Sequence, residues 1–343
     1  MLQLHNTSPF VATMFSLPDI DGVDTLVIVI KASFALAPSV QLAEQQRPIL
    51  AADEFWGEPT STSLRYPGEL HLPKPGTDVI VIAEARAPHE QGVPELDVSV
   101  RVADRSKRAR VYGERMWMVV GRHAQPSRPQ PFVRMPIIYE RAYGGRTPPD
   151  HAGRSLAEPR NPIGRGFVGD GNYARMLEQL VPNIDDPDNA LAWLGQTPAP
   201  VGFGAIAPSW HPRVAHAGTY DEAWRKQRAP YLPNDFDARF FRTASDGLGF
   251  DAELAGGAPM AFDGFHPERG LSFALPRCQL DVSARVAGAV QSLPARLDTV
   301  VIELLEPCWM SMTWRASSRV GERLLRVERV DVGLASLELG GPA

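Results

Sequence analysis

Turn-forming residues are spread over the whole chain and confine it to short elements of secondary structure. The sequence holds 32 prolines and 29 glycines in 343 residues, against average usages of about 5% for proline and about 7% for glycine. Proline interrupts helices and central strands, and glycine favours turns. We therefore expect no long helix, and a fold of short segments joined by many turns.

Strand patterns occur toward both ends of the chain. Residues 95–102 alternate apolar and polar side chains with a period of two, as a half-buried strand does. We expect residues 111–120 to return beside them after a polar turn at 104–108. Further strands are expected at 25–36, 78–86, 132–143, 271–275, 279–286, 299–305, 309–315 and 324–332. Because no long helices alternate with these strands, they predict a mainly β fold, with antiparallel β-sandwich or partial-barrel sheets from the N- and C-terminal segments.

The middle of the chain has a different character. Residues 144–249 are rich in proline, glycine, arginine and aromatic residues, and capping signals predict short helices there at 172–180, 188–194, 219–224 and 235–241. Loop-rich stretches of this length are typically functional. We expect a β region over 1–143, a loop-rich region over 144–249 and a second β region over 250–343, packed as one or two compact domains.

Composition argues against several classes of protein. A net charge of −5 does not favour nucleic-acid binding, because such proteins usually present a basic face. The apolar run at 26–30 is far shorter than the about 20 residues of a membrane span, and no signal-peptide pattern precedes it. We therefore expect no membrane insertion and a cytoplasmic location. Two cysteines, Cys278 and Cys308, are too few for a disulfide framework or a thiolate zinc site.

The common catalytic and cofactor-binding motifs are missing from the sequence. No lysine follows a glycine, which excludes a P-loop, and the G-x-S-x-G motif of hydrolases does not occur. Residues 164–169 spell G-x-G-x-x-G, but the preceding residues 158–162 (EPRNP) are not a buried strand, so a tight glycine loop explains them better than a dinucleotide site. We predict no enzyme activity, no cofactor and no metal.

Carboxylates in the middle region leave one alternative open. Paired carboxylates beside aromatic rings are what a glycosidase cleft or a sugar-binding platform needs. The same carboxylates suit helix caps and partners for nearby arginines, which is the simpler interpretation. The residues concerned are Asp221, Glu222, Asp235 and Asp237, among Trp210, Trp224 and Tyr231.

A series of short motifs in the middle region resembles the bacterial family called domain of unknown function 2169 (DUF2169). The motifs are 140–145 (ERAYGG), 161–167 (NPIGRGF), 182–187 (PNIDDP), 200–204 (PVGFG), 210–213 (WHPR), 218–224 (GTYDEAW) and 232–237 (LPNDFD). The flanking segments 74–79 (KPGTDV) and 111–117 (VYGERMW) are also similar to the family. One departure lies at 244–247 (ASDG), where the family tends to have Ala-Pro and an Asp-Gln pair. If this loop touches a partner, the choice of partner differs here.

The resemblance implies an accessory of type VI secretion. Members of the family look like effector adaptors or chaperones, which bind a toxic effector and help load it onto a spike of VgrG-type and PAAR-type proteins. Such a protein needs no catalytic centre. Its partner-binding residues are expected among exposed aromatics, and we predict Trp210, Tyr220 and Trp224. We expect the recurrent motif residues to be architectural: Gly144, Gly145, Asn161, Gly164, Gly166, Gly202, Gly204, Asp235 and Asp237.

Overall fold

The computed structural model describes residues 3–121, 123–169, 176–177, 179–268 and 270–341. Strands account for 41% and helices for 8% of the structure, which confirms the prediction of a mainly β protein. The described helices are short: α1 (Glu222–Gln227) and the 3-10 helices η1 (Pro88–Glu90), η2 (Tyr139–Arg141), η4 (Arg213–His216), η5 (Ala238–Phe241) and η6 (Gly321–Arg326).

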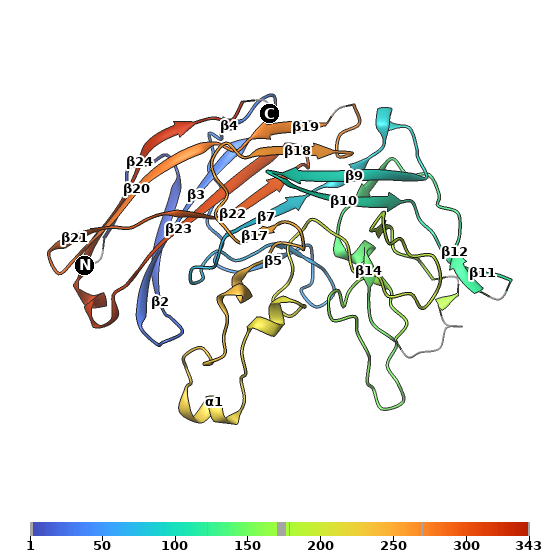
Figure 1. The fold of residues 1–343 in the computed structure, drawn as a ribbon, viewed down its shortest axis with the longest axis horizontal. Helices are drawn as coiled ribbons and strands as arrows, with labels where there is room; N and C mark the ends of the chain where they lie inside the picture. Colours follow the sequence, from blue (N-terminus) through green and yellow to red (C-terminus); the bar gives the residue numbers. More distant parts are fainter. Residues whose placement is uncertain (1–2, 122, 170–175, 178, 269, 342–343) are drawn as a thin grey trace.

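The largest sheet has seven strands and combines both ends of the chain (Figure 1). Its order is β17 (Gly249–Phe250), β7 (Thr77–Ile82), β22 (Arg296–Glu303), β23 (Trp309–Arg319), β3 (Asp24–Ala35) and β2 (Val11–Pro18), with β4 (Gln41–Leu42) paired to β3. β22 lies parallel to β7 and antiparallel to β23. The N- and C-terminal strands therefore share a sheet instead of forming separate ones.

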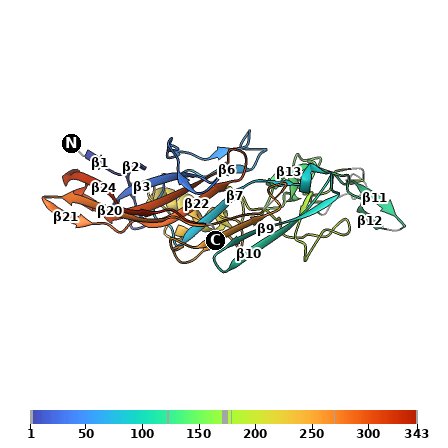
Figure 2. The same ribbon diagram turned by 90° about the horizontal axis from the view of Figure 1, so that it is seen from above.

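Two smaller sheets also draw on distant parts of the sequence. One has the order β16 (Ile184–Asp185), β10 (Arg105–Tyr112), β9 (Glu95–Val102), β18 (Pro259–Asp263) and β19 (Leu271–Ala274). The other has the order β1 (Gln3–Asn6), β24 (Val327–Glu338), β20 (Arg277–Val286) and β21 (Ala289–Ser292). One hydrophobic core connects all three sheets and extends along the chain from Phe10 to Val332. The molecule is elongated and thin when seen from above (Figure 2).

Two-stranded pairs complete the described structure. They are β5 (Glu54–Phe55) with β6 (Leu64–Tyr66), β8 (Glu84–Arg86) with β13 (Arg134–Pro136), β11 (Trp117–Val120) with β12 (His123–Pro126), and β14 (Tyr143–Gly144) with β15 (Arg165–Gly166). The β11–β12 hairpin lies at one end of the molecule, opposite the end that carries β21 (Figure 1).

Two expected strands differ from the observed ones. The partner of β9 is β10, which begins at Arg105 directly after a tight turn, whereas residues 111–120 were expected to be this strand and 104–108 its turn. The first half of β10 carries charged side chains because it lies on the exposed rim of the sheet, so it has the composition of a turn. Residues 132–143 form the short strand β13 and the helix η2 instead of one long strand.

The outer face of the seven-stranded sheet carries a row of polar side chains. Asp78, Thr299, Thr313 and Lys31 are register partners on four successive strands, and all four are buried. The segment that precedes β7 covers this row: its Glu69 accepts hydrogen bonds from Lys31 Nζ (2.8 Å) and Thr313 Oγ1 (2.8 Å). Buried charges require such partners.

A second pair of buried charges extends the same network. Arg315 Nε donates to Asp298 Oδ2 (2.7 Å), and Lys74 Nζ lies 3.8 Å from Asp298 Oδ1. Burial alone would raise the pKa of Asp298, but the positive charges of Lys74 and Arg315 hold it below its ordinary value. Burial together with the charge of Arg315 lowers the pKa of His71 to about 3, so this imidazole is neutral.

Apolar side chains beside the polar row attach the middle region to the sheet. Val27, Val29 and Leu72 form a buried cluster, against which Leu232 and Phe241 of the middle region pack. The Phe241 ring also stacks on His71 at 4.9 Å. The loop-rich segment is therefore anchored on the outer face of the sheet, which gives it a rigid support.

The glycine motifs lie where the backbone approaches other atoms closely. Gly144 has φ +148°, and a Cβ there would lie 2.1 Å from the carbonyl oxygen of Asn161. Asn161 is fully buried and its side-chain amide donates to the carbonyls of Tyr139 (2.8 Å) and Tyr143 (2.9 Å). These contacts hold β14 and β15 together, as an architectural role requires.

The other motif glycines differ in whether their φ angle or their close neighbours require glycine. Gly145 and Gly166 have positive φ, and a Cβ on Gly164 would meet the carbonyl oxygen of Ala142 at 2.6 Å. A Cβ on Gly202 would meet the Tyr139 ring at 2.8 Å. Gly204 has neither a positive φ nor a neighbour closer than 4.0 Å, so nothing in the structure requires glycine at that position.

Candidate partner-binding site

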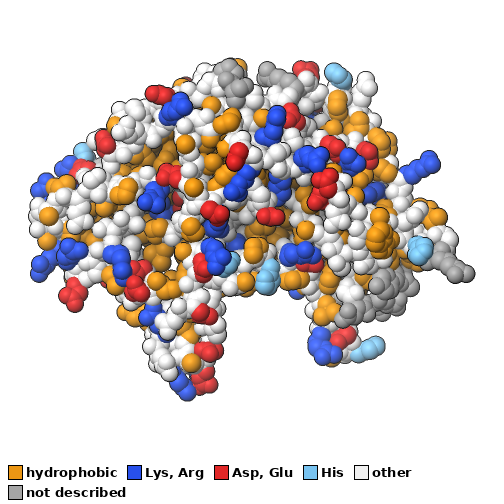
Figure 3. Space-filling model, in the orientation of Figure 1, with side chains coloured by type: hydrophobic (Ala, Val, Ile, Leu, Met, Phe, Trp, Pro, Cys, Tyr) orange, Lys and Arg blue, Asp and Glu red, His pale blue; other side chains and the backbone are white. Residues whose placement is uncertain are grey.

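An arm formed by residues 217–237 projects from the body of the protein and carries α1 at its tip (Figure 1). Hydrogen bonds across its base hold it together: Thr219 donates from N and Oγ1 to the Asp235 carboxylate (2.9 and 2.7 Å), and Asp237 N donates to the His216 carbonyl (3.0 Å). The space-filling view shows a hollow between this arm and a second projection (Figure 3). Because of the hydrogen bonds across its base, the arm is an ordered, hairpin-like loop.

The tip of the arm is stabilised by side chains, because six residues are too few for an isolated helix. Asp221 caps α1 by accepting from Trp224 N (2.8 Å), whereas the sequence suggested a capping box beginning at Thr219. The Trp224 indole donates to the Tyr231 carbonyl (2.9 Å) and packs edge-to-face with Tyr220, with 4.7 Å between ring centroids. The aromatic pair therefore orders the tip.

Contacts with the turn between β2 and β3 fix the direction of the arm. Arg228 donates from Nε to the Leu232 carbonyl (2.8 Å) and from Nη2 to the carbonyl of Ile20, in the β2–β3 turn. The Tyr231 ring covers Gly22 of the same turn. The seven-stranded sheet thus supports the arm directly.

The three predicted anchor residues occupy different environments. Tyr220 is 54% exposed, and Trp224 is half-buried beneath it. Trp210 is only 4% exposed and packs edge-to-face on Tyr139, with 5.6 Å between ring centroids. Trp210 is therefore a core residue, and the exposed aromatic surface of the arm consists of Tyr220, Trp224 and Tyr231.

The four carboxylates that suggested a carbohydrate site all have structural partners. Asp221 caps α1, Asp235 closes the base of the arm, and Glu222 pairs with Lys226 at 2.9 Å. Asp237 accepts from Arg239, which lowers its pKa to about 2. A glycosidase needs one carboxylic acid whose pKa is raised, and these interactions do not raise the pKa of Asp235 or Asp237.

The expected short helices are partly present. α1 and η5 correspond to the expected helices at 219–224 and 235–241, although η5 is a 3-10 helix capped by Asp237. Residues 188–194 form no helix but turns, bends and irregular backbone, and at their start Asp188 N donates to Asp186 Oδ1 (2.9 Å) in a local turn. Most of the expected helix at 172–180 lies outside the described residues.

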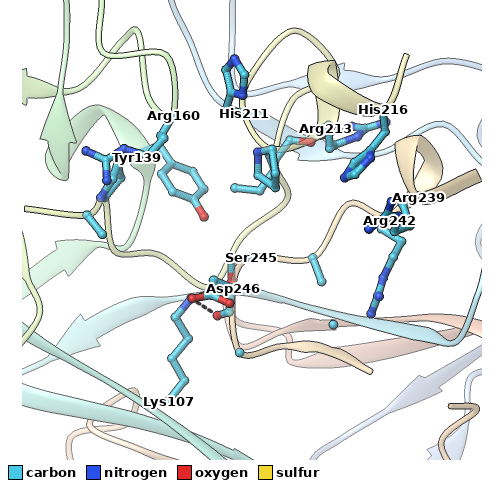
Figure 4. Close-up of a pocket in the computed structure, with 17 residues that line it drawn as sticks. Lys107, Tyr139, Arg160, His211, Arg213, His216, Arg239, Arg242, Ser245 and Asp246 are labelled. Atoms are coloured by element: carbon cyan, nitrogen blue, oxygen red, sulfur yellow. Dashed lines mark hydrogen bonds between the residues drawn. The ribbon is translucent and has the colours of Figure 1, made fainter. Parts of the chain in front are cut away.

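A cavity of about 460 Å³ lies at the base of the arm (Figure 4). Its walls come from β10, η2, η4, η5 and the loop 244–249, so it includes the segment in which the sequence departs from its family resemblance. No pattern in the sequence indicated this cavity, because its lining residues are distributed between positions 107 and 249.

Two cations in the cavity wall are held by neutral groups. Lys107 Nζ donates to Ser245 Oγ (3.0 Å) and to the Asp246 carbonyl (2.6 Å), and burial lowers the pKa of Lys107 to about 8. Arg213 donates from Nε to the Phe240 carbonyl (2.9 Å) and from Nη1 to the Ile206 carbonyl (2.6 Å). Burial also lowers the pKa of Arg213, to about 10. Both side chains remain cationic at neutral pH.

Neither a metal-binding cluster nor a membrane-spanning helix is present among the described residues. No group of three or more His, Cys, Asp or Glu side chains is placed to hold a metal ion. None of the described helices has the length and apolar character required to cross a membrane.

A family model described as an uncharacterized protein conserved in bacteria, DUF2169, matches residues 21–315. The match includes β3, β4, β7, β17 and β22 of the seven-stranded sheet, most of β23, and the whole arm. Of this sheet, only β2 lies entirely outside it. No curated protein and no solved structure gave a significant match.

Proposed function

We propose that the chain, which belongs to the bacterial DUF2169 family, is a non-enzymatic adaptor or chaperone. In this proposal it binds a type VI secretion effector and helps load it onto a spike of VgrG-type and PAAR-type proteins. The observation that carries the proposal is the ordered arm with exposed aromatic rings, supported by a rigid sheet and adjoining a preformed cavity.

The arm has the properties of a binding element. Tyrosine and tryptophan dominate the energetics of protein interfaces, and Tyr220 and Trp224 stand on an element whose geometry is fixed by capping and by the Arg228 contacts. Such preorganisation favours binding because less conformational entropy is lost on association. An adaptor requires this kind of display and no chemical step.

The carbohydrate-active alternative lacks a specific observation in its favour. The carboxylates that suggested it hold the arm together or pair with basic side chains. We therefore assign the arm to protein recognition. Loading of an effector before secretion would take place in the bacterial cytoplasm.

Co-purification with the effector encoded next to this protein's gene tests the proposal. We expect the folded wild-type protein to retain the effector and Tyr220→Ala to weaken retention at least tenfold, since hot-spot aromatics contribute about 2 kcal/mol or more. Trp193→Ala is the matched control, because Trp193 is 56% exposed but lies outside the arm. Wild-type protein that retains neither effector nor spike protein, yet hydrolyses a polysaccharide, contradicts the proposal.

A further inference from the structure

The cavity at the base of the arm contains more positive than negative side chains. Five cations line it, against one carboxylate: Lys107, Arg160, Arg213, Arg239 and Arg242 against Asp246. They converge from separate elements, and Figure 4 shows Lys107 on one side of the cavity with Arg213, Arg239 and Arg242 on the other. This accumulation is notable in a chain with a net charge of −5.

Three of the five cations have carboxylate partners outside the lining. Arg160 pairs with Glu158, Arg239 with Asp237 and Arg242 with Asp251, each at 2.6 Å. Within the described residues, Lys107 and Arg213 have hydroxyl and carbonyl partners but no ion pair. Lys107 and Arg213 therefore have no described carboxylate within hydrogen-bond distance, although Asp246 lies near Lys107 and Asp78 lies near Arg213.

Hydrogen-bond donors also remain available on these two side chains. A lysine amine has three donors, and the partners of Lys107 Nζ are Ser245 and Asp246. Arg213 engages Nε and Nη1, which leaves Nη2 without a described partner. Cations that are largely removed from water and bind only neutral groups are destabilising, so an acidic group that accepts from either side chain would be favourable.

Apolar side chains form other parts of the wall. Pro200, Ile206 and Ala244 line the cavity beside the cations, and its volume of about 460 Å³ lies in the range of ligand pockets. A small hydrated anion would leave these apolar surfaces unpaired. A peptide that alternates acidic and apolar residues would match both the charge and the walls.

We propose that this cavity binds carboxylates of an acidic, partly apolar segment of the partner polypeptide. The proposal rests on the proposed adaptor function and adds the chemistry of the bound segment. Lys107 and Arg213, on opposite sides of the cavity, each bind a carboxylate of this segment, the apolar wall receives a neighbouring side chain, and the aromatic arm contacts the rest of the partner. The loop 244–247 forms part of the wall, so its sequence influences which segment fits.

Fluorescence anisotropy with the full-length protein tests the proposal. The probe is a short peptide that alternates Glu and Leu and carries a neutral fluorophore, and its control has Gln in place of Glu. We expect the Glu peptide to bind at least tenfold more tightly than the Gln peptide. Lys107→Gln should weaken Glu-peptide binding by roughly tenfold or more, as expected for loss of a charge-assisted hydrogen bond.

Arg101→Gln is the matched control, because it removes an exposed cation from β9, away from the cavity, and should bind the Glu peptide like wild type. Equal binding of the two peptides, or wild-type affinity in Lys107→Gln, overturns the proposal. If inorganic phosphate displaces the peptide at equal concentration, the cavity is a site for free anions and the proposal is also wrong.

Capture of the neighbouring effector by the same proteins separates this proposal from the adaptor function. If wild type retains the effector but does not prefer the Glu peptide, the cavity proposal fails and the adaptor function stands. If wild type prefers the Glu peptide but retains no effector, the adaptor function fails.

Discussion

Replacing Glu69 by glutamine tests whether the covering segment is held to the seven-stranded sheet by buried charge. The Glu69 carboxylate accepts from Lys31 Nζ, Thr313 Oγ1 and Leu50 N, each at 2.8 Å. Glutamine has nearly the same shape and keeps one oxygen toward Lys31 and Leu50, and its amide can donate to Thr313 Oγ1. The substitution therefore removes the charge while retaining most of the hydrogen bonds.

The expected loss of stability follows from burial. The Lys31 and Glu69 side chains are 7% and 11% exposed, so Glu69→Gln leaves Lys31 as a buried cation without a counter-charge, bound only by the glutamine oxygen and the Pro48 carbonyl. Breaking a buried pair on one side is destabilising by about 3–5 kcal/mol. Because glutamine preserves hydrogen bonds, we expect about 3 kcal/mol.

Glu222→Gln is the matched control. Its Oε1 lies 2.9 Å from Lys226 Nζ, nearly the same separation, but the two side chains are 66% and 67% exposed. Exposed pairs of this kind on a helix contribute about 0.3–0.5 kcal/mol. Urea unfolding of the wild type and both variants measures the two losses. If both variants lose the same unfolding free energy, below about 1 kcal/mol, the buried Lys31–Glu69 pair does not stabilise the protein as expected.

Two further predictions concern the frame that supports the site. Gly144→Ala should destabilise the protein by more than about 2 kcal/mol, because Gly144 has φ +148° and an added Cβ would clash with the Asn161 carbonyl; a wild-type thermal midpoint contradicts this. Stability should fall by about 2 kcal/mol between pH 7.5 and pH 5, since unfolding frees His71 to take up a proton, which its pKa of about 3 prevents in the folded state. Because the pKa of His71 is 6.5 in the unfolded chain and about 3 in the folded protein, stability is lost as the pH falls from about 6.5 to about 3. The lowered pKa of Asp298 causes a further loss of stability at the acid end of this range. Urea unfolding midpoints measured across this pH range test the prediction, and the His71→Asn variant should show a weaker dependence on pH. A wild-type midpoint that does not change with pH would contradict it.

Local pattern predicted many strands but not their partners. The period-two alternation located β9 at residues 95–102, as observed, because one face of that strand is buried and the other is not. Alternation carries no information about pairing, so the insertion of β22 and β23 between β7 and β3 was not predictable from it. The charged half of β10 gave no strand signal because it lies at an exposed rim.

The candidate site was less predictable than the strands. The sequence predicted a short helix at 219–224 from a capping box beginning at Thr219, although the observed cap is Asp221, and it did not predict that the helix lies on a projecting arm. It could not distinguish the buried Trp210 from the exposed Tyr220, because aromatic residues suit both a core and an interface. The cavity depends on Lys107 and Arg213 coming together from distant segments, which only the tertiary structure determines.

The proposed adaptor function requires this protein to connect an effector to the secretion spike. The most direct test is size-exclusion chromatography of the purified effector with the spike and tip proteins, with and without this protein. We expect the effector to co-elute with the spike when wild-type protein is present, and co-elution to be lost without it and reduced with Tyr220→Ala. Co-elution of effector and spike to the same extent without this protein would contradict the proposed adaptor function.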